Sequence, residues 1–166
     1  MITRITERIS MASSFPLARV QHHNGKYFSI KGALMPEDPT LQRLVNLARQ
    51  RNDLAALWLY GSRARESHHA GSDYDLAVVF TDWLEPALDR RLRPELLALD
   101  WQQALGLPEG RLSVVDLAIA PIPLAWTVLS EGRRLLDLHP QLRMQQETRI
   151  MSRWELDYLH QRKRHA

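Results

Sequence analysis

The sequence contains no cysteine. This absence excludes a disulfide framework and a zinc site built on thiolates, and it agrees with a reducing compartment. Its apolar runs are far shorter than the roughly 20 residues that a membrane-spanning helix needs. The first 20 residues, MITRITERISMASSFPLARV, lack a compact apolar segment followed by a small-residue cleavage site, so no secretory signal is expected. The sequence therefore predicts a cytoplasmic protein.

The composition is that of a folded chain with one hydrophobic core. Of 166 residues, 45% are hydrophobic and 25% are charged, which argues against disorder and for a single domain with a small appendage. The net charge is only +3, and the basic residues are scattered apart from Arg90, Arg91, Arg93 and the tail HQRKRHA. Such a tail can bind nucleic acid or an acidic partner, but a solvated helix end is the preferred interpretation.

Residues 1–34 differ from the rest of the chain. The stretch LARVQHHNGKYFSI places Asn24-Gly25 between short, partly apolar segments, and Asn-Gly accepts the positive φ angles of a tight hairpin turn. We therefore expect an N-terminal hairpin extension at 1–34 and a main domain at 35–166. The extension is either an added element for binding a partner or a stretch that precedes a natural start at Met35.

The main domain alternates helical and strand patterns. Asp38 and Pro39 are typical of a helix start, and apolar residues recur on one face of 37–53. Continuous apolar runs at 54–60 and 74–80 predict strands that are buried on both faces, and 111–120 predicts a third strand. Further helices are expected at 85–105, which Pro94 kinks or divides in two, at 123–137 with Gly132 as its terminator, and at 140–164.

Two carboxylates mark the start of the second strand. Asp73 and Asp75 are two residues apart, so their side chains point to the same face of an extended chain. Adjacent anions repel, and keeping both ionised requires a cation nearby. Mg²⁺ suits oxygen ligands and is typically held by carboxylates together with the phosphates of a substrate. This pair therefore predicts a magnesium site that serves a nucleotide.

A Gly-Ser turn directly follows the first strand. Gly61 lets the backbone approach a phosphate, and Ser62 offers a hydroxyl and a backbone N–H. Arg63 and Arg65 can neutralise triphosphate charge. Gly-Ser alone is typical of a simple turn, and Asp-x-Asp alone is typical of a solvated strand edge. The two motifs together, between two strands, are a much more specific signal for a nucleotide site. His68 and His69 lie in the intervening loop, where exposed histidines are the simpler interpretation.

The segment GSRARESHHAGSDYDLAVV resembles the signature of the polymerase-β-like nucleotidyltransferase superfamily, which is Gly-Ser, ten residues and Asp-x-Asp. Over residues 36–160 the chain resembles the minimal, MntA-type nucleotidyltransferases. The resemblance implies an α/β (α+β) fold with a small mixed sheet flanked by helices. It also implies Mg²⁺-dependent transfer of a nucleoside monophosphate from a triphosphate such as ATP. Many such proteins are encoded beside a HEPN-domain ribonuclease toxin and act as its antitoxin, some by adding AMP to a toxin tyrosine.

The resemblance also implies a third carboxylate on the next strand, as a metal ligand or as an aid to deprotonation. Asp116 is the only acid in RLSVVDLAIA, whereas relatives often have two, the first at the position of Ser113. Residues three apart in a strand face opposite ways. If the first position is the functional one, Asp116 is the wrong residue and the enzyme is impaired. Asp116 is then a capping or ion-pairing residue at the edge of the sheet.

The sequence thus favours a Mg²⁺- and ATP-dependent nucleotidyltransferase that modifies a protein, with a HEPN toxin as partner. Three alternatives remain open. An aminoglycoside-type enzyme would need a second lobe, which a homo-oligomer could supply. A binding-only antitoxin is favoured by Ser113 and the extension at 1–34. A nucleic-acid-binding module rests only on the positive charge and the basic tail.

Overall fold

The computed structural model describes residues 38–65, 69 and 71–164, with side chains described as far as Asp157. The expected hairpin within 1–34 lies outside the described residues, as does His68. All of the elements below lie between Pro39 and Arg164.

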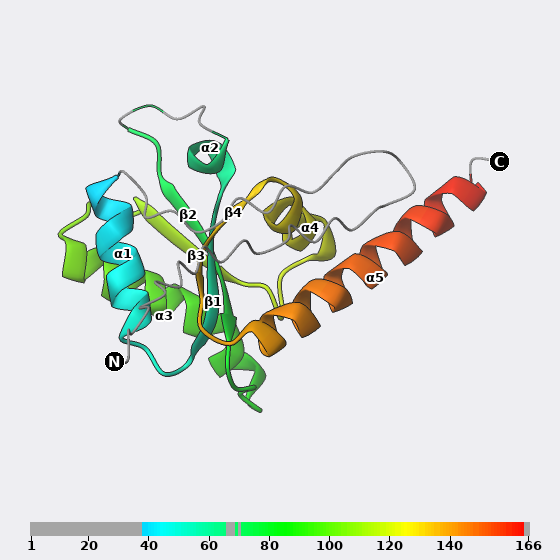
Figure 1. Cartoon of the computed structure of the whole chain (residues 1–166), viewed down its shortest axis with the longest axis horizontal. Coiled ribbons are helices and arrows are strands. Elements are labelled where there is room, and N and C mark those ends of the chain that lie inside the picture. Colours follow the sequence, from blue (N-terminus) through cyan, green and yellow to red (C-terminus); the bar gives the residue numbers. More distant parts are fainter. Residues whose placement is uncertain (1–37, 66–68, 70, 165–166) are drawn as a thin grey trace, which may run out of the picture. The chain divides into compact units, whose positions relative to one another are not determined.

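Four strands form one mixed sheet (Figure 1). They are β1 (Leu54–Tyr60), β2 (Tyr74–Phe80), β3 (Leu112–Asp116) and β4 (Arg133–Asp137), in the spatial order β3-β2-β1-β4. β1 is antiparallel to both β2 and β4, whereas β2 and β3 are parallel. The small mixed sheet expected from the sequence is confirmed.

Helices cover both faces of this sheet (Figure 1). The helices are α1 (Pro39–Arg49), the single turn α2 (Gly61–Ala64), α3 (Ala87–Leu105), α4 (Ile122–Glu131) and α5 (Pro140–Arg164). α1 and α3 pack on one face, and α4 and α5 pack on the other. Since both faces are covered, the central strands are buried on both sides.

Residues of the central strands alternate between two separate cores, except that Ala55 and Ala56 of β1 both enter the same one, at an irregularity in the pairing of β1 with β2. One core lies under α1 and α3, and the other lies under α4 and α5. In β2, Leu76 and Val78 belong to the first core, and Ala77 and Val79 belong to the second. The prediction that 54–60 and 74–80 are buried on both faces is therefore confirmed.

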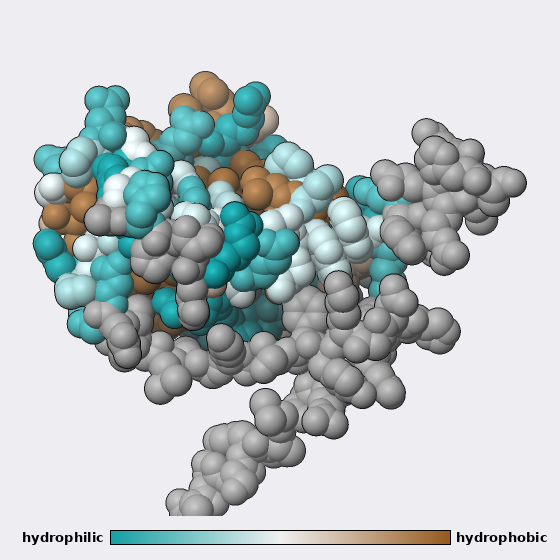
Figure 2. All heavy atoms as spheres, turned by 90° about the horizontal axis from the view of Figure 1, so that it is seen from above, coloured by the Kyte–Doolittle hydropathy of each residue, from teal (hydrophilic) through white to brown (hydrophobic). Residues whose placement is uncertain are grey.

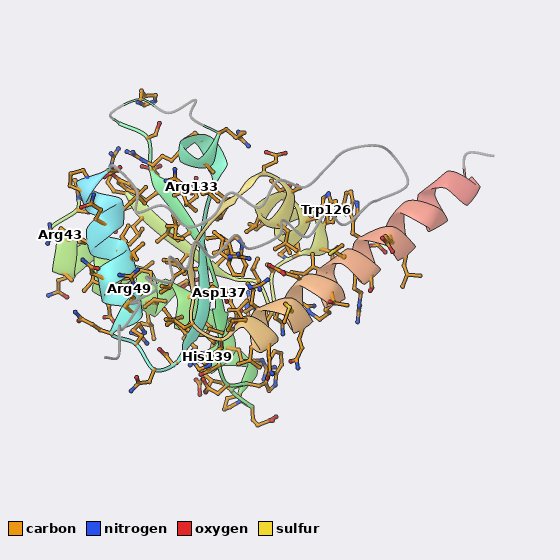
Figure 3. The ribbon with its side chains drawn as sticks, in the orientation of Figure 1. Arg43, Arg49, Trp126, Arg133, Asp137 and His139 are labelled. Atoms are coloured by element: carbon orange, nitrogen blue, oxygen red, sulfur yellow. The ribbon has the colours of Figure 1, made fainter. Side chains whose placement is uncertain are left out.

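The first helix begins as its sequence predicts. The Asp38 carboxylate accepts the backbone N–H groups of Thr40 and Leu41, at 2.8 and 3.4 Å, and so caps α1. Arg43, on the outer side of α1 (Figure 3), donates to the carbonyl of Ala104 at 3.1 Å. That bond ties α1 to the last turn of α3.

The second long helix runs through its internal proline. α3 is one continuous helix from Ala87 to Leu105, so Pro94 does not divide it, and the Pro94 ring is buried. The helix ends at Gly106, which has a positive φ of 64°. Glycine adopts this left-handed conformation without the steric penalty that a Cβ brings.

The expected helix at 123–137 is wrong in its second half. α4 ends at Glu131, and the following residues form β4, which pairs with β1. Gly132 takes an extended conformation, and a Cβ there would overlap the carbonyl oxygen of Val128 and crowd that of Leu59. The close approach to β1 lets the chain leave α4 and enter the sheet immediately, with Leu135 and Leu136 buried.

In the face shown in Figure 2, hydrophobic patches lie among hydrophilic residues. Within the described residues, no helix combines the length and apolar character that a membrane crossing requires.

Gly132→Ala tests the origin of β4. The added Cβ must displace backbone atoms, so we expect unfolding in urea to show a loss of about 1–3 kcal/mol. Ser130→Ala is the matched control, because Ser130 precedes this contact and bonds only within its own helix. Equal stability of Gly132→Ala and the wild-type protein would show that the close approach imposes no constraint.

Candidate functional site

The turn after β1 is built around a contact that only glycine permits. Gly61 has a φ of +69°, and a Cβ on it would overlap Oδ2 of Asp75. The antiparallel register places Tyr60 opposite Asp75, so the turn and the carboxylate are held by adjacent strands. The structure therefore brings the predicted Gly-Ser turn and one predicted acid together.

The other oxygen of Asp75 is held by the third strand. Ser113 lies beside Asp75 in the parallel register, and its hydroxyl donates to Oδ1 at 2.9 Å. Tyr60 completes this group. Burial, and then the negative charge of Asp75, raise the pKa of the Tyr60 phenol, while a hydrogen bond with Ser113 acts in the opposite direction. Asp75 thus sits among neutral hydroxyl groups.

Asp73 precedes β2 on the same side of the chain as Asp75. Tyr74, between them, is buried in the core under α1 and α3, so alternation directs the two acids to the opposite side. The Asp73 side chain is 55% exposed, and its Oδ1 lies 3.6 Å from the Arg111 guanidinium. The site therefore presents one accessible carboxylate beside one that is firmly anchored.

Arg63 does not lie where the sequence suggested. Its guanidinium donates to the carbonyl of Ser72 at 2.8 and 3.1 Å and to that of Asp73 at 3.2 Å. It also pairs with Asp38 at 3.3 Å and stacks 3.8 Å from the centre of the Tyr74 ring. With its side chain only 7% exposed, Arg63 anchors the segment that carries Asp73 rather than offering its charge to a phosphate.

The remaining predicted nucleotide contacts lie in or next to α2. Ser62 is in its first turn, next to Gly61. Arg65 caps its end and forms a half-exposed ion pair with Glu131 of α4 at 3.0 Å. His69 forms hydrogen bonds within its own loop. The Gly71 N–H donates to its Nδ1, and the His69 backbone N–H donates to the Ser72 hydroxyl.

Asp116 lies away from this group, which corrects the expectation that it completes the site. It pairs with Val78, three residues along β3 from Ser113, a separation of about 10 Å with the opposite facing. Its carboxylate accepts the N–H of Ala118 at 2.8 Å, and burial raises its pKa. It lines a separate cavity of about 130 Å³ with Arg90 and Arg93.

Two carboxylates, not three, are therefore available for a metal ion. No cluster of three or more His, Cys, Asp or Glu side chains with metal-binding geometry occurs among residues 38–65, 69 and 71–164. Asp73 and Asp75 nevertheless fit Mg²⁺, which commonly binds through one or two carboxylates and takes its other ligands from phosphates and water.

Three contributors to the site were not predicted as site residues. The sequence placed Tyr60 in a strand and gave Arg111 no role. Ser113 was considered only as the position where relatives often have an acid. The registers of β1 with β2 and of β2 with β3 place Tyr60 and Ser113 beside Asp75, and Arg111 lies 3.6 Å from Asp73. A correct strand order would have identified Tyr60 and Ser113, since each lies opposite Asp75.

A family comparison matches most of the described domain. The family described as "Polymerase beta, Nucleotidyltransferase" matches residues 42–141, which is more than half of the chain and includes the whole site. A comparison with curated proteins found no match.

Solved structures share the fold at low sequence identity. One is a toxin–antitoxin complex with AMP-PNP, with a TM-score of 0.58, 22% identity, and coverage of 73% of this chain and 91% of the other. A chain of a tri-AMPylated HEPN toxin in complex with an MNT antitoxin from Shewanella oneidensis matches with a TM-score of 0.53 and 21% identity, covering 73% and 88%. An MntA–HepT toxin–antitoxin structure gives 0.53 and 21%, covering 73% and 89%.

The burial of Asp116 predicts a pH-dependent stability. Because its pKa is raised in the folded state, its ionisation opposes folding once the pH exceeds the ordinary value of about 3.9. Asp116→Asn keeps an acceptor for the Ala118 N–H but does not ionise. We expect the stability of the wild-type protein relative to this variant to fall as the pH rises from about 3 to 7. Urea unfolding at several pH values measures it, and a relative stability that rises with pH would contradict the assignment.

Proposed function

Because this chain belongs to the polymerase beta nucleotidyltransferase family, we propose that it transfers AMP from ATP to a protein acceptor and thereby acts as an antitoxin. The observation that carries the proposal is the contact between the Gly61 turn and the Asp75 carboxylate, with Asp73 beside it. A glycine turn that can approach a phosphate lies directly against a carboxylate that can hold a metal ion.

Asp73 and Asp75 are proposed to hold Mg²⁺, which when bound neutralises and polarises a triphosphate. Asp75 is prepositioned, since the hydroxyl of Ser113 and the Gly61 backbone fix its orientation. Ser62 is the proposed donor to a terminal phosphate oxygen. Arg65 and Arg111 are half-exposed or partly exposed cations at the same site and are suited to balance triphosphate charge.

Arg63 has a positioning role in this proposal. By bonding the carbonyls of Ser72 and Asp73 it fixes the backbone from which the Asp73 carboxylate projects. Its contact with Tyr74 holds the start of β2 from the opposite side of the chain.

The proposed reaction is an in-line displacement. A hydroxyl oxygen of the acceptor forms a bond to the α-phosphorus of ATP as the bond to the bridging α–β oxygen breaks. Pyrophosphate leaves, and the hydroxyl proton passes to water. Positioning and charge stabilisation supply most of the catalysis in reactions of this class.

A HEPN-domain toxin is the proposed acceptor. The support is that similar solved structures come from toxin–antitoxin complexes, one with AMP-PNP and one in which the HEPN toxin is AMPylated. The chain covers 91% and 88% of those matched chains, so the resemblance spans nearly all of each one. The catalytic unit is proposed to be residues 35–166, with 1–34 as an extension.

Ser113 favours a second candidate function. It occupies the position beside Asp75 where a third carboxylate would stand, and it supplies a neutral hydroxyl instead. A site with two acids would transfer AMP slowly or would bind ATP without chemistry. In the second case the protein would neutralise its toxin by binding alone.

Labelled ATP distinguishes these functions. The full-length chain, Mg²⁺, α-labelled ATP and a HEPN-domain toxin are mixed, and label on the toxin is measured. We expect Asp73→Asn with Asp75→Asn to reduce transfer roughly 100-fold or more, because two charged groups that hold the metal are lost. Asp116→Asn is the control and should transfer at close to the wild-type rate.

No transfer by the wild-type protein, or undiminished transfer by the double variant, would refute the enzymatic proposal. Toxin activity is measured in the same mixtures. If neither the wild-type protein nor the double variant transfers label, and both still neutralise the toxin fully, the binding-only antitoxin is established.

Ser113→Asp tests whether the third carboxylate is the missing part. The added acid lies beside Asp75, so we expect transfer to rise roughly 10-fold. Three carboxylates repel without a cation, and the variant should therefore melt at a lower temperature than the wild-type protein and recover when Mg²⁺ is added. Ser113→Asn, which adds similar bulk without charge, should show neither effect. A Ser113→Asp variant that does not respond to Mg²⁺ would place the metal elsewhere.

A further inference from the structure

α3 is apolar on two opposite sides. Its inner side packs into the core through Pro94, Leu97, Trp101 and Leu105, all of which are buried. Its outer side carries four leucines that are far more exposed: Leu88 (66%), Leu92 (38%), Leu96 (57%) and Leu99 (56%). A surface helix of a single globular domain normally has one apolar side only.

The four exposed leucines, which we call the α3 stripe, form one continuous surface. Their spacing of four, four and three residues places them on one side of the helix, opposite the buried set. The α3 stripe spans 12 residues, and its first and last leucines are about 17 Å apart along the helix at 1.5 Å per residue. An exposed apolar stripe of this regularity is typical of a surface that packs against another protein.

We propose that the α3 stripe is a homodimer interface in which two copies of α3 pack antiparallel about a two-fold axis. A two-fold contact requires a self-complementary surface. An axis at the middle of the stripe places Leu92 opposite Leu96 of the second copy, and Leu88 opposite Leu99 of the second copy. Every leucine of the stripe then has a leucine partner.

The charges beside the stripe support this arrangement. Arg91 and Glu95 lie on one flank and are both exposed. In the same antiparallel register Arg91 lies opposite Glu95 of the second copy, and Glu95 lies opposite Arg91 of the second copy. The contact therefore gains two ion pairs. On the other flank Asp89 and Asp100 lie at a similar angle from the stripe and bring like charges together in the same register, which offsets part of this attraction and limits the affinity. We therefore expect a dissociation constant on the order of micromolar.

The dimer leaves the candidate site open. Asp75 shares its side of β2 with Ala77 and Val79, which belong to the core under α4 and α5. α3 covers the opposite face of the sheet. The two functions of the molecule therefore use different faces, and the homodimer does not depend on the proposed transferase activity.

Sedimentation of the full-length chain tests the proposal. We expect the mass to rise from one chain of 19.2 kDa toward twice that value as the protein concentration increases through the micromolar range. Leu92→Glu with Leu96→Glu should raise the dissociation constant roughly 100-fold, because charges replace leucines at the centre of the contact. Leu156→Glu is the matched control, since Leu156 on α5 is equally exposed (55%) and should leave dimerisation unchanged.

The absence of cysteine allows the register to be tested by cross-linking. Leu92→Cys and Leu96→Cys are prepared separately, oxidised alone and oxidised as a mixture. The antiparallel register predicts a covalent dimer mainly in the mixture, because each cysteine then faces the other position. A wild-type protein that stays monomeric at high concentration, or a dimer that survives Leu92→Glu with Leu96→Glu, would overturn the proposal. Cross-linking of Leu92→Cys with itself in preference to the mixture would overturn the register.

Discussion

The seating of the Asp75 carboxylate against the Cα of Gly61 is the constraint on which the rest of the site depends. The carboxylate occupies the volume that any Cβ would need, and Gly61 adopts a positive φ that other residues rarely take. The antiparallel register of β1 and β2 holds the two residues opposite one another. The Gly61 turn and the acid therefore form one unit, and neither can move without disturbing the most central pair of strands.

The parallel pairing of β2 with β3 then decides which residue joins that unit. Ser113 falls beside Asp75, whereas Asp116 falls beside Val78 and faces the other way. Burial raises the pKa of Asp116, while its bond to the Ala118 N–H compensates part of that cost at the end of the strand. Two polar residues of one short strand thus have different roles, one at the site and one at the exit from the sheet.

Patterns within one segment were predictable, and contacts between segments were not. The uninterrupted apolar runs at 54–60 and 74–80 indicated strands buried on both faces, and Asp38 indicated a cap, because these signals depend on local chemistry. β4 was missed because RRLLD has no clear alternation and continues a helical pattern. The partners of Arg63 were not predicted for a related reason. Ser72 and Tyr74 lie across a loop from it, so the sequence indicated only its proximity to Gly61 and not these contacts.

Ser113, which stands where a third carboxylate was expected, changes the charge balance of the site. Asp73 and Asp75 bring two negative charges, and Ser113 adds a hydrogen bond without adding charge. One divalent cation is sufficient to neutralise two carboxylates, whereas a third would leave repulsion that only a further cation relieves. Arg111, close to Asp73, already offsets part of the negative charge. The described residues at this site therefore carry less negative charge than a site with three carboxylates would.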